Sequence, residues 1–419
     1  MGDTITSTMF RQALMRCRLW LTFSLLCNAG LLLVIPSHVY ASRFGPPWLA
    51  EVIVDQAIVR SEPRPDADPI GPVERGSRHI VLEHSKVENG AQWMRIEQGW
   101  LNLDDIDEVR QPWVAEVTAE SASVYALPNA GGAIRRTAEQ GSLLRVAGLS
   151  PGLDGDSNTW WATTEGYVTL NALSPASGEW TETWRLPTAA EALGGWWGGV
   201  GEDANVRAAP AGTAPLLGQL HPGDRVKVLA EEEGSLADGS RAWYRIDGGR
   251  FAGGHVHSSL ISRLPDPTPN NTLPEGASGG GTWIVVDRAA SSLTVMTDAE
   301  VQFVTYVSLG RAGVETPVGL YSTFGKYLTD DMTSSSVPDA DHSYDLPNVP
   351  FTQYYRSGGY AVHSAYWHDH FGGLESQGCI NVTWADGAYL FDLTSPTLVP
   401  GNFIRWSEPE EATPLVIVG

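Results

Sequence analysis

The sequence predicts a mainly β protein, with three small barrels followed by a larger β domain that contains one or two short helices. The 419 residues include 45 Gly and 27 Pro, which favours many short strands joined by turns over long helices. Short runs of alternating apolar and polar residues recur along the chain, and such alternation is typical of half-buried strands. A chain of this length is also expected to divide into more than one domain.

The charge balance argues against a nucleic-acid partner. The formal net charge is -22, and the chain has no cluster of Lys and Arg that could bind phosphates. Hydrophobic residues make up 42% and charged residues 18%, a composition typical of a globular rather than a disordered chain.

Residues 1–41 have the order of an export signal. Arginines precede an apolar run at 19–35, and Val39 and Ala41 supply the small residues of a cleavage site. The segment is therefore a signal peptide or, if it is not cleaved, a membrane anchor through residues 19–35. Both alternatives place the remaining chain outside the cytoplasm, in the cell envelope.

The cysteines point to one thiol of interest. Cys17 and Cys27 lie in the export segment, which leaves Cys379 in a cleaved product, with no intrachain disulfide. A free thiol outside the cytoplasm is prone to oxidation. Catalysis is one reason to keep it, and an inert core cysteine is the alternative.

A pattern recurs about every 70 residues in the middle of the chain. It predicts three repeats at 48–110, 113–175 (more diverged) and 200–264. A Trp/Gly-rich connector at 176–199 separates the last two, and a linker at 265–281 follows the third. The linker is rich in Pro, Asn and Gly, which favours extended and flexible chain.

Each repeat contains short alternating strands separated by Gly, Pro and Asp turns, which is the signature of a small barrel. A recurring Trp is large enough to fill such a core. These are Trp93, Trp160 with Trp161, and Trp243. The copies resemble bacterial Src-homology-three-like repeats, which commonly attach envelope enzymes to peptidoglycan. Binding of a ligand and simple spacing of the next domain both remain open.

Residues 282–419 predict a second kind of β domain. Strand-like alternation occurs at 283–287, 292–296 and 302–308, and helical spacing of apolar residues appears at 385–393. Within this domain His363 precedes Cys379, which follows Gly378, and this arrangement suggests a thiolate nucleophile with an imidazole base.

A metal site is the alternative for the histidines, because imidazole and carboxylate groups also bind zinc. His363, His368, Asp369 and His370 are the candidate ligands. They lack the helical spacing of paired His ligands, so we predict no metal and no cofactor.

The domain resembles the L,D-transpeptidase catalytic domain family, enzymes that cross-link peptidoglycan with a cysteine nucleophile. The matching motifs are Thr316-Pro317-Val318-Gly319, Val349-Pro350-Phe351, His363-Ser364, Trp367-His368-Asp369 and Ser376-Gln377-Gly378-Cys379-Ile380-Asn381. The resemblance implies a β-sandwich-like fold. One departure is Gln377, because the family usually has His or Arg before the Gly-Cys pair.

By this resemblance Cys379 is the nucleophile, His363 the proton donor and acceptor, and Ser364 the residue that orients the His363 ring. The backbone N–H groups of Gly378 and Cys379 would form the oxyanion hole. Further residues are expected to support the site or to line a substrate groove. The supporting residues are Ser376, Gln377, Asn381, His368 and Asp369, and the groove residues are Tyr344, Tyr354 and Trp367.

The implied reaction is acyl transfer on a peptidoglycan stem peptide. Cys379 attacks the carbonyl of the third stem residue, D-alanine leaves, and an amine of another stem (a 3-3 cross-link) or of an anchored protein accepts the acyl group. Water as acceptor would make the protein an L,D-carboxypeptidase, and a decayed domain would make it a non-catalytic wall-binding protein. We expect a monomer. Carbapenems acylate the cysteine of this family.

Overall fold

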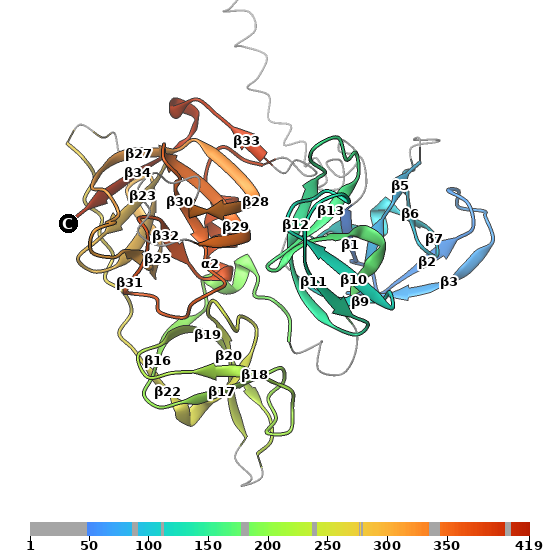
Figure 1. Ribbon diagram of the computed structural model, residues 1–419, viewed down its shortest axis with the longest axis horizontal. Helices are drawn as coiled ribbons and strands as arrows, with labels where there is room; N and C mark the ends of the chain where they lie inside the picture. Colours follow the sequence, from blue (N-terminus) through green and yellow to red (C-terminus); the bar gives the residue numbers. More distant parts are fainter. Residues whose placement is uncertain are drawn as a thin grey trace, which may run out of the picture.

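The computed structural model describes residues 48–85, 91–109, 113–176, 184–236, 241–275, 277, 280–334, 344–398 and 404–419. The predicted export segment at 1–41 lies outside these residues. Within the described part of the chain, no helix is both long enough and apolar enough to cross a membrane. Four β-rich units follow one another along the sequence (Figure 1).

The first unit contains two small sheets. Its elements are β1 (Trp48–Val52), β2 (Gln56–Arg60), β3 (Pro69–Glu74), β4 (Arg78–Val81), β5 (Glu83–His84), β6 (Trp93–Ile96), β7 (Gly99–Asn102), η3 (Leu103–Asp105) and β8 (Ile106–Glu108). The strand orders are β3-β2-β7-β6-β5 and β4-β1-β8. β4 and β5 follow each other closely in sequence, so the two sheets together form one continuous series of strands.

The second and third units each contain one seven-stranded sheet. The second comprises β9 (Trp113–Val117), β10 (Ser121–Tyr125), β11 (Ile134–Glu139), β12 (Leu143–Pro151), β13 (Thr159–Thr163), β14 (Gly166–Thr169), η4 (Leu170–Ala172) and β15 (Leu173–Pro175). The third comprises β16 (Trp196–Val200), β17 (Ala204–Arg207), β18 (Leu216–Leu220), β19 (Arg225–Glu233), β20 (Ala242–Asp247), β21 (His255–His257), η6 (Ser258–Leu260) and β22 (Ile261–Arg263).

These two units share one topology. Their strand orders are β11-β10-β14-β13-β12-β9-β15 and β18-β17-β21-β20-β19-β16-β22, so each strand of one has its counterpart in the other. The first unit follows the same order, with β4 and β5 in place of one long strand. In the described residues none of these sheets pairs its first strand with its last, so the units are open rather than closed barrels.

Recurring Trp and Gly residues explain why three diverged sequences adopt this topology. Trp93, Trp160 and Trp243 are each at most 5% exposed and occupy corresponding positions of corresponding strands. Gly99 and Gly166 begin the next strand at a close approach of two strands. A Cβ at these positions would lie 2.6 Å from the Arg60 carbonyl oxygen and 2.4 Å from the Tyr125 carbonyl oxygen, respectively, so only Gly fits.

The C-terminal unit is a sandwich of two five-stranded sheets with a further small sheet. The strand orders are β25-β24-β23-β34-β27, β32-β30-β29-β28-β33 and β26-β31. Its elements are β23 (Thr282–Asp287), β24 (Ser292–Thr297), β25 (Glu300–Tyr306), β26 (Leu309–Gly310), β27 (Gly319–Thr323), β28 (Gly325–Thr333), β29 (Asp345–Arg356), β30 (Tyr360–Ser364), β31 (Leu374–Ser376), β32 (Ile380–Val382), α2 (Trp384–Leu393), β33 (Ile404–Trp406), η8 (Pro409–Glu411) and β34 (Thr413–Val418).

The core of this unit joins both sheets to the helix. Val286 and Leu293 from one sheet pack with Val362 and Ile380 from the other, and Leu390 of α2 joins the same cluster. Alternation of apolar residues along the strands therefore faces inward from both sheets. The predicted fold class, mainly β with small repeats before a β-sandwich-like domain, is confirmed.

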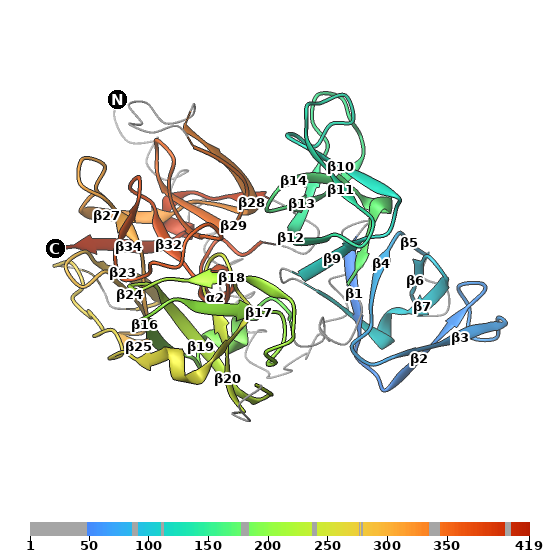
Figure 2. The ribbon, with the colours of Figure 1, turned by 60° about the horizontal axis from the view of Figure 1, so that its bottom comes forward.

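The second and third units both contact the sandwich, whereas the first lies beside the second, at the far end of the molecule (Figures 1 and 2). From the sandwich, Asn348 on β29 donates through Nδ2 to the carbonyl oxygens of Thr163 (2.7 Å) and Gly166 (3.1 Å) of the second unit. Arg135 of the second unit forms an ion pair with Asp345 at 2.9 Å.

The third unit is joined to the sandwich through the start of α2. Asp247 at the end of β20 accepts the backbone N–H groups of Trp384 (3.3 Å) and Ala385 (2.9 Å). A carboxylate at this position satisfies helix N–H groups that have no partner within the helix. Beside it, Lys227 Nζ lies 2.6 Å from Asp386 Oδ1, and both side chains are at most 3% exposed.

Two predictions about connecting segments change. β16 starts at Trp196, so the third sheet begins inside the predicted connector 176–199, which also holds the short helix η5 (Ala189–Ala192). Within the predicted flexible linker 265–281, the described residue Asn270 is bonded to the sandwich. It donates through its backbone N–H to Thr294 Oγ1 (3.0 Å) and through Nδ2 to Asp287 Oδ2 (2.8 Å).

We predict that Lys227→Met destabilises the protein by about 3–5 kcal/mol, because it leaves the Asp386 carboxylate buried without its cation. Denaturant unfolding of the full chain measures this loss. The double variant Lys227→Met/Asp386→Leu removes both charges and is expected to recover most of the stability. Equal destabilisation in the single and double variants would contradict the role assigned to the pair.

Candidate active site

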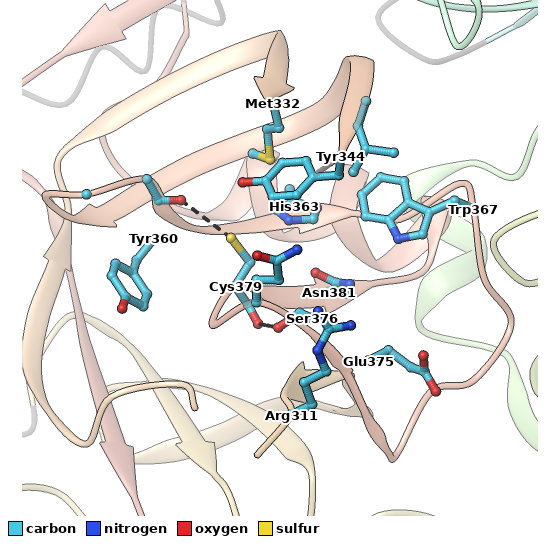
Figure 3. Close-up of a pocket in the computed structure, with 14 residues that line it drawn as sticks. Arg311, Met332, Tyr344, Tyr360, His363, Trp367, Glu375, Ser376, Cys379 and Asn381 are labelled. Carbon is cyan, nitrogen blue, oxygen red and sulfur yellow. Dashed lines mark hydrogen bonds between the residues drawn. The ribbon is translucent and has the colours of Figure 1, made fainter. Parts of the chain in front are cut away.

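Parallel pairing of two short strands brings the predicted site residues together. In β30 and β32, Val362 is opposite Ile380 and His363 is opposite Asn381. Cys379 directly precedes β32, so its side chain and that of His363 line one pocket of about 160 Å³ (Figure 3). Its lining also includes Arg311, Met332, Tyr344, Leu346, Gly358, Gly359, Tyr360, Trp367, Glu375, Ser376, Gln377 and Asn381.

The His363 ring is held in one tautomer. Its Nδ1 lies 3.2 Å from the carbonyl oxygen of Ser364, and a carbonyl can only accept, so Nδ1 carries the proton. Nε2 therefore has the free lone pair of a base. Burial lowers the pKa of His363 to about 4, because a charged imidazolium loses its hydration there. At neutral pH His363 is an uncharged base.

The Cys379 thiol is also uncharged at neutral pH. The side chain is half-buried, and its Sγ donates to the carbonyl oxygen of Gly359 at 3.4 Å. Burial raises the pKa of the thiol to about 11, although a backbone hydrogen bond from Ala361 opposes this shift. The resting pair is thus a neutral thiol and a neutral imidazole, not a preformed thiolate–imidazolium pair.

The turn before Cys379 requires Gly378 and uses its N–H group. Gly378 has φ +108°, and a Cβ there would lie 2.6 Å from Cε1 of Tyr360. Its N–H donates to Ser376 Oγ at 3.1 Å, while the same hydroxyl donates to the Cys379 carbonyl oxygen at 2.7 Å. A serine hydroxyl that accepts from the residue two positions later is a common turn.

This turn bears on the predicted oxyanion hole, for which Gly378 and Cys379 are the expected backbone donors. The Gly378 N–H already donates to Ser376 Oγ here, so the part of Gly378 in such a hole stays a prediction together with that of Cys379. Ser376 therefore shapes the turn that presents the thiol.

Ser364 lies behind His363 rather than in the pocket. Its carbonyl oxygen accepts the bond from His363, while its hydroxyl donates to the Thr383 carbonyl oxygen at 2.9 Å. The Ser364 group in contact with the His363 ring is therefore its carbonyl and not its hydroxyl.

His368 and Asp369 connect the pocket to the third unit. His368 Nε2 lies 3.0 Å from the side-chain amide of Asn381. Asp369 is 1% exposed and accepts from the Gly249 N–H (2.7 Å) and from Arg250 Nε (2.6 Å). Burial raises the pKa of Asp369, and the Arg250 guanidinium opposes that rise. The loop between His363 and Cys379 is thus fixed by the third unit.

The predicted groove residues divide into two groups. Tyr344 and Trp367 line the pocket, and the Trp367 ring lies 5.6 Å from the His363 ring. Tyr354 does not line it. Its hydroxyl donates to Asp330 Oδ2 at 2.5 Å, and its ring is parallel to that of Trp406, so the prediction for Tyr354 is replaced by a packing role. Gln377 is half-buried and lines the pocket.

Three further residues line the pocket although no motif in the sequence indicated them as site residues. They are Arg311, Tyr360 and Glu375. Arg311 directly follows Gly310, which ends β26. A cation next to a strand end was the sequence signal that could have indicated this site residue. Tyr360 has no distinguishing motif. Among the described residues, no group of three His, Cys, Asp or Glu side chains is placed to hold a metal ion.

Comparison with known proteins agrees with the resemblance read from the sequence. Residues 281–417 match the family model of the L,D-transpeptidase catalytic domain, and residues 202–262 match that of a bacterial SH3 domain. The chain therefore contains an L,D-transpeptidase catalytic domain after a bacterial SH3 domain. No curated protein matches the chain.

Several solved structures are similar over part of the chain. An LD transpeptidase (LdtMt1) in complex with imipenem is 22% identical, covering 43% of this chain and 71% of that one, with a TM-score of 0.27. An L,D-transpeptidase from Mycobacterium smegmatis is 21% identical over 40% and 72%, with a TM-score of 0.27. L,D-transpeptidase 3 from Mycobacterium tuberculosis is 23% identical over 33% and 61%, with a TM-score of 0.27.

We predict that alkylation of Cys379 by iodoacetamide accelerates about tenfold per pH unit from about pH 7 to about pH 10, because only the thiolate reacts and its pKa lies above this range. Mass spectrometry of the full chain measures the rate. Gln377→Arg places a guanidinium beside the pocket and should shift the profile to lower pH. A rate that is already constant at about pH 8 would contradict the neutral resting pair.

Proposed function

We propose that this protein is a peptidoglycan L,D-transpeptidase with Cys379 as nucleophile and His363 as general base and acid. The observation that supports this most directly is the shared pocket. It contains a partly exposed thiol and an imidazole whose Nε2 lone pair is available because Nδ1 binds the Ser364 carbonyl. Both residues lie in the part of the chain that matches the L,D-transpeptidase catalytic domain.

In the first half-reaction, Sγ of Cys379 attacks the carbonyl carbon of the third residue of a tetrapeptide stem. The thiol proton passes to Nε2 of His363, since neither group is charged at the start. Cys379 N–H is the backbone donor available to the oxygen that becomes negative. His363 then protonates the departing amine of D-alanine, and a thioester between Cys379 and the stem remains.

In the second half-reaction, an amine of a second stem attacks the thioester carbonyl, and His363 accepts its proton. The bond between the carbonyl carbon and Sγ breaks, and His363 returns the proton to the Cys379 sulfur, which restores the resting pair. The new amide bond is a 3-3 cross-link between stems. An amine of an anchored protein would give attachment of that protein instead. Tyr344 and Trp367, which line the pocket beside His363, are placed to contact the peptide during both steps.

Water in place of the amine would make the protein an L,D-carboxypeptidase. The accepting amine therefore has to compete with water for the thioester through its own binding. We favour the transpeptidase because the site lies in a catalytic domain of that family.

The remaining chain fits delivery of this site to the cell wall. We propose that residues 1–41 export the protein and that the three repeats, at 48–110, 113–175 and from the start of β16 to 264, hold the catalytic domain in the envelope. The third repeat, which overlaps the match to a bacterial SH3 domain, also fixes the loop of the active site through Asp369. It is therefore both a tether and a part of the enzyme.

The nucleophile is tested with imipenem. We predict that the full chain gains the mass of one imipenem molecule on Cys379, because the thiol attacks the strained lactam carbonyl. Intact-mass measurement and peptide mapping identify the modified residue. Cys379→Ala is expected to stay unmodified, and an undiminished adduct on that variant would refute the assignment.

The reaction type is tested with purified disaccharide-tetrapeptide. We predict release of D-alanine together with a cross-linked dimer, measured by liquid chromatography and mass spectrometry. His363→Ala should lower the rate by about 100-fold or more, because the thiol loses its base. Monomeric tripeptide without dimer would indicate the carboxypeptidase, and no conversion by a chain that imipenem acylates would refute turnover of this stem.

A further inference from the structure

One wall of the pocket is supplied by the hairpin of β28 and β29. Met332, Tyr344 and Leu346 (the wall residues) line the pocket from this hairpin, and Figure 3 shows Met332 and Tyr344 next to His363. Met332 and Leu346 are opposite one another across the two strands. The direction of the hairpin therefore decides where the wall residues lie relative to His363 on β30 and Cys379 at the start of β32.

A β-bulge bends this hairpin directly before the wall residues. The register shifts after Asp330, so that two residues of β29 lie opposite one residue of β28. One of these two residues, Asn348, has φ +51°, a left-handed conformation that Asn adopts more readily than most residues. Its N–H donates to Asp331 Oδ1 at 2.8 Å. Because a bulge changes the direction of a strand, Asn348 lies at the point that aims the wall residues.

The second unit holds this bend through the Asn348 side chain. Nδ2 donates to the carbonyl oxygens of Thr163 (2.7 Å) and Gly166 (3.1 Å), which end β13 and begin β14, and Asn348 is 0% exposed. The two acceptors are themselves fixed, because Thr163 is paired with Gly166 and its hydroxyl donates to the Gly166 carbonyl oxygen at 2.8 Å. A shift of the bend would leave the buried amide without its acceptors, which is unfavourable.

Two further contacts join the second unit to the hairpin, and they are of different kinds. Gly148 of β12 allows a close approach of β28, because a Cβ there would lie 2.7 Å from Leu328 Cδ2. Arg135 and Asp345 form an ion pair at 2.9 Å, but the Asp345 side chain is 57% exposed, and exposed pairs contribute little. The buried amide of Asn348 is therefore the polar contact that fixes the bend.

We propose that Asn348 is a positioning residue for the reaction, through which the second unit sets the peptide-binding wall of the pocket. The proposal rests on the proposed function, in which the stem peptide contacts the pocket. Docking of Asn348 on the turn between β13 and β14 sets the bend, and the bend sets the wall residues. His363 and Cys379 depend instead on the pairing of β30 with β32. Loss of the Asn348 amide should therefore weaken peptide binding and leave the reactivity of the thiol unchanged.

The first test uses Asn348→Gly, which removes the amide and keeps the backbone conformation, since glycine adopts φ +51° without strain. In the full chain we expect KM for disaccharide-tetrapeptide to rise about 10-fold, while kcat stays within about threefold of the wild type. Iodoacetamide should alkylate Cys379 within about twofold of the wild-type rate. Wild-type kinetics, a fall in kcat with unchanged KM, or a larger change in the alkylation rate would each overturn the positioning role.

Two further variants separate the amide from other contacts of the hairpin. Arg135→Ala removes the exposed ion pair between the same two parts of the chain and should leave KM within about twofold of the wild type. Asn348→Asp keeps the size of the side chain but sets a carboxylate against two carbonyl oxygens, so it should raise KM at least as much as Asn348→Gly. A wild-type KM in Asn348→Asp would show that the donated bonds do not matter and would overturn the proposal.

The second test measures binding without turnover, in the Cys379→Ala background. Calorimetry of the full chain with disaccharide-tetrapeptide should show binding that is about 10-fold weaker when Asn348→Gly is added. If the wild type shows no turnover but binding depends on Asn348, the proposed reaction is refuted and the positioning role is supported. Equal binding with and without Asn348→Gly would overturn the positioning role, and absence of binding in Cys379→Ala would refute both.

Discussion

The site depends above all on the parallel pairing of β30 with β32. These two short strands are distant in sequence, and their register alone sets His363 opposite Asn381 with Cys379 at the strand entrance. A shift by one residue would turn every side chain of β32 to the opposite face. The buried residues Val362 and Ile380, which join the core between the two sheets, hold this register. The relative placement of His363 and Cys379 thus depends on the hydrophobic core, and the bonds of Ser376 and Gly359 then fix the turn and the thiol.

The third repeat extends this constraint to the loop between the two strands. Asp369 is buried and receives bonds from Gly249 and Arg250, and its backbone oxygen accepts the Arg225 N–H at 2.7 Å. The adjacent His368 contacts Asn381 in the pocket. Removal of the repeat would take away both the donors to the Asp369 carboxylate and the segment at Gly248 and Gly249 that covers it, so the loop would lose its anchor. An accessory domain and a catalytic loop therefore form one structural unit, although the sequence shows them as separate segments.

Features with a local signature could be predicted from the sequence, and features that depend on long-range contacts could not. The recurring Trp and Gly residues indicated the repeats, since each has a steric role within its own unit. The Gly-Cys pair and His363 indicated the catalytic chemistry. The bond between Gly378 N–H and Ser376 and the packing of Tyr354 against Trp406 depend on side-chain orientation. The position of Arg311 depends on the pairing of β26 with β31, and neither strand is long enough to leave a pattern.

Burial of the Cys379 thiol bears on its stability in a protein that we propose to be exported. Burial raises the pKa of this thiol, and because oxidants attack the thiolate, a lower thiolate fraction slows oxidation. A preformed ion pair would be more reactive toward peptides and toward oxidants alike. In the reaction that we propose, the uncharged His363 accepts the proton only as Cys379 attacks, so the reactive form would arise only when a stem is bound. The same burial that slows oxidation therefore makes the reaction depend on correct placement of the peptide.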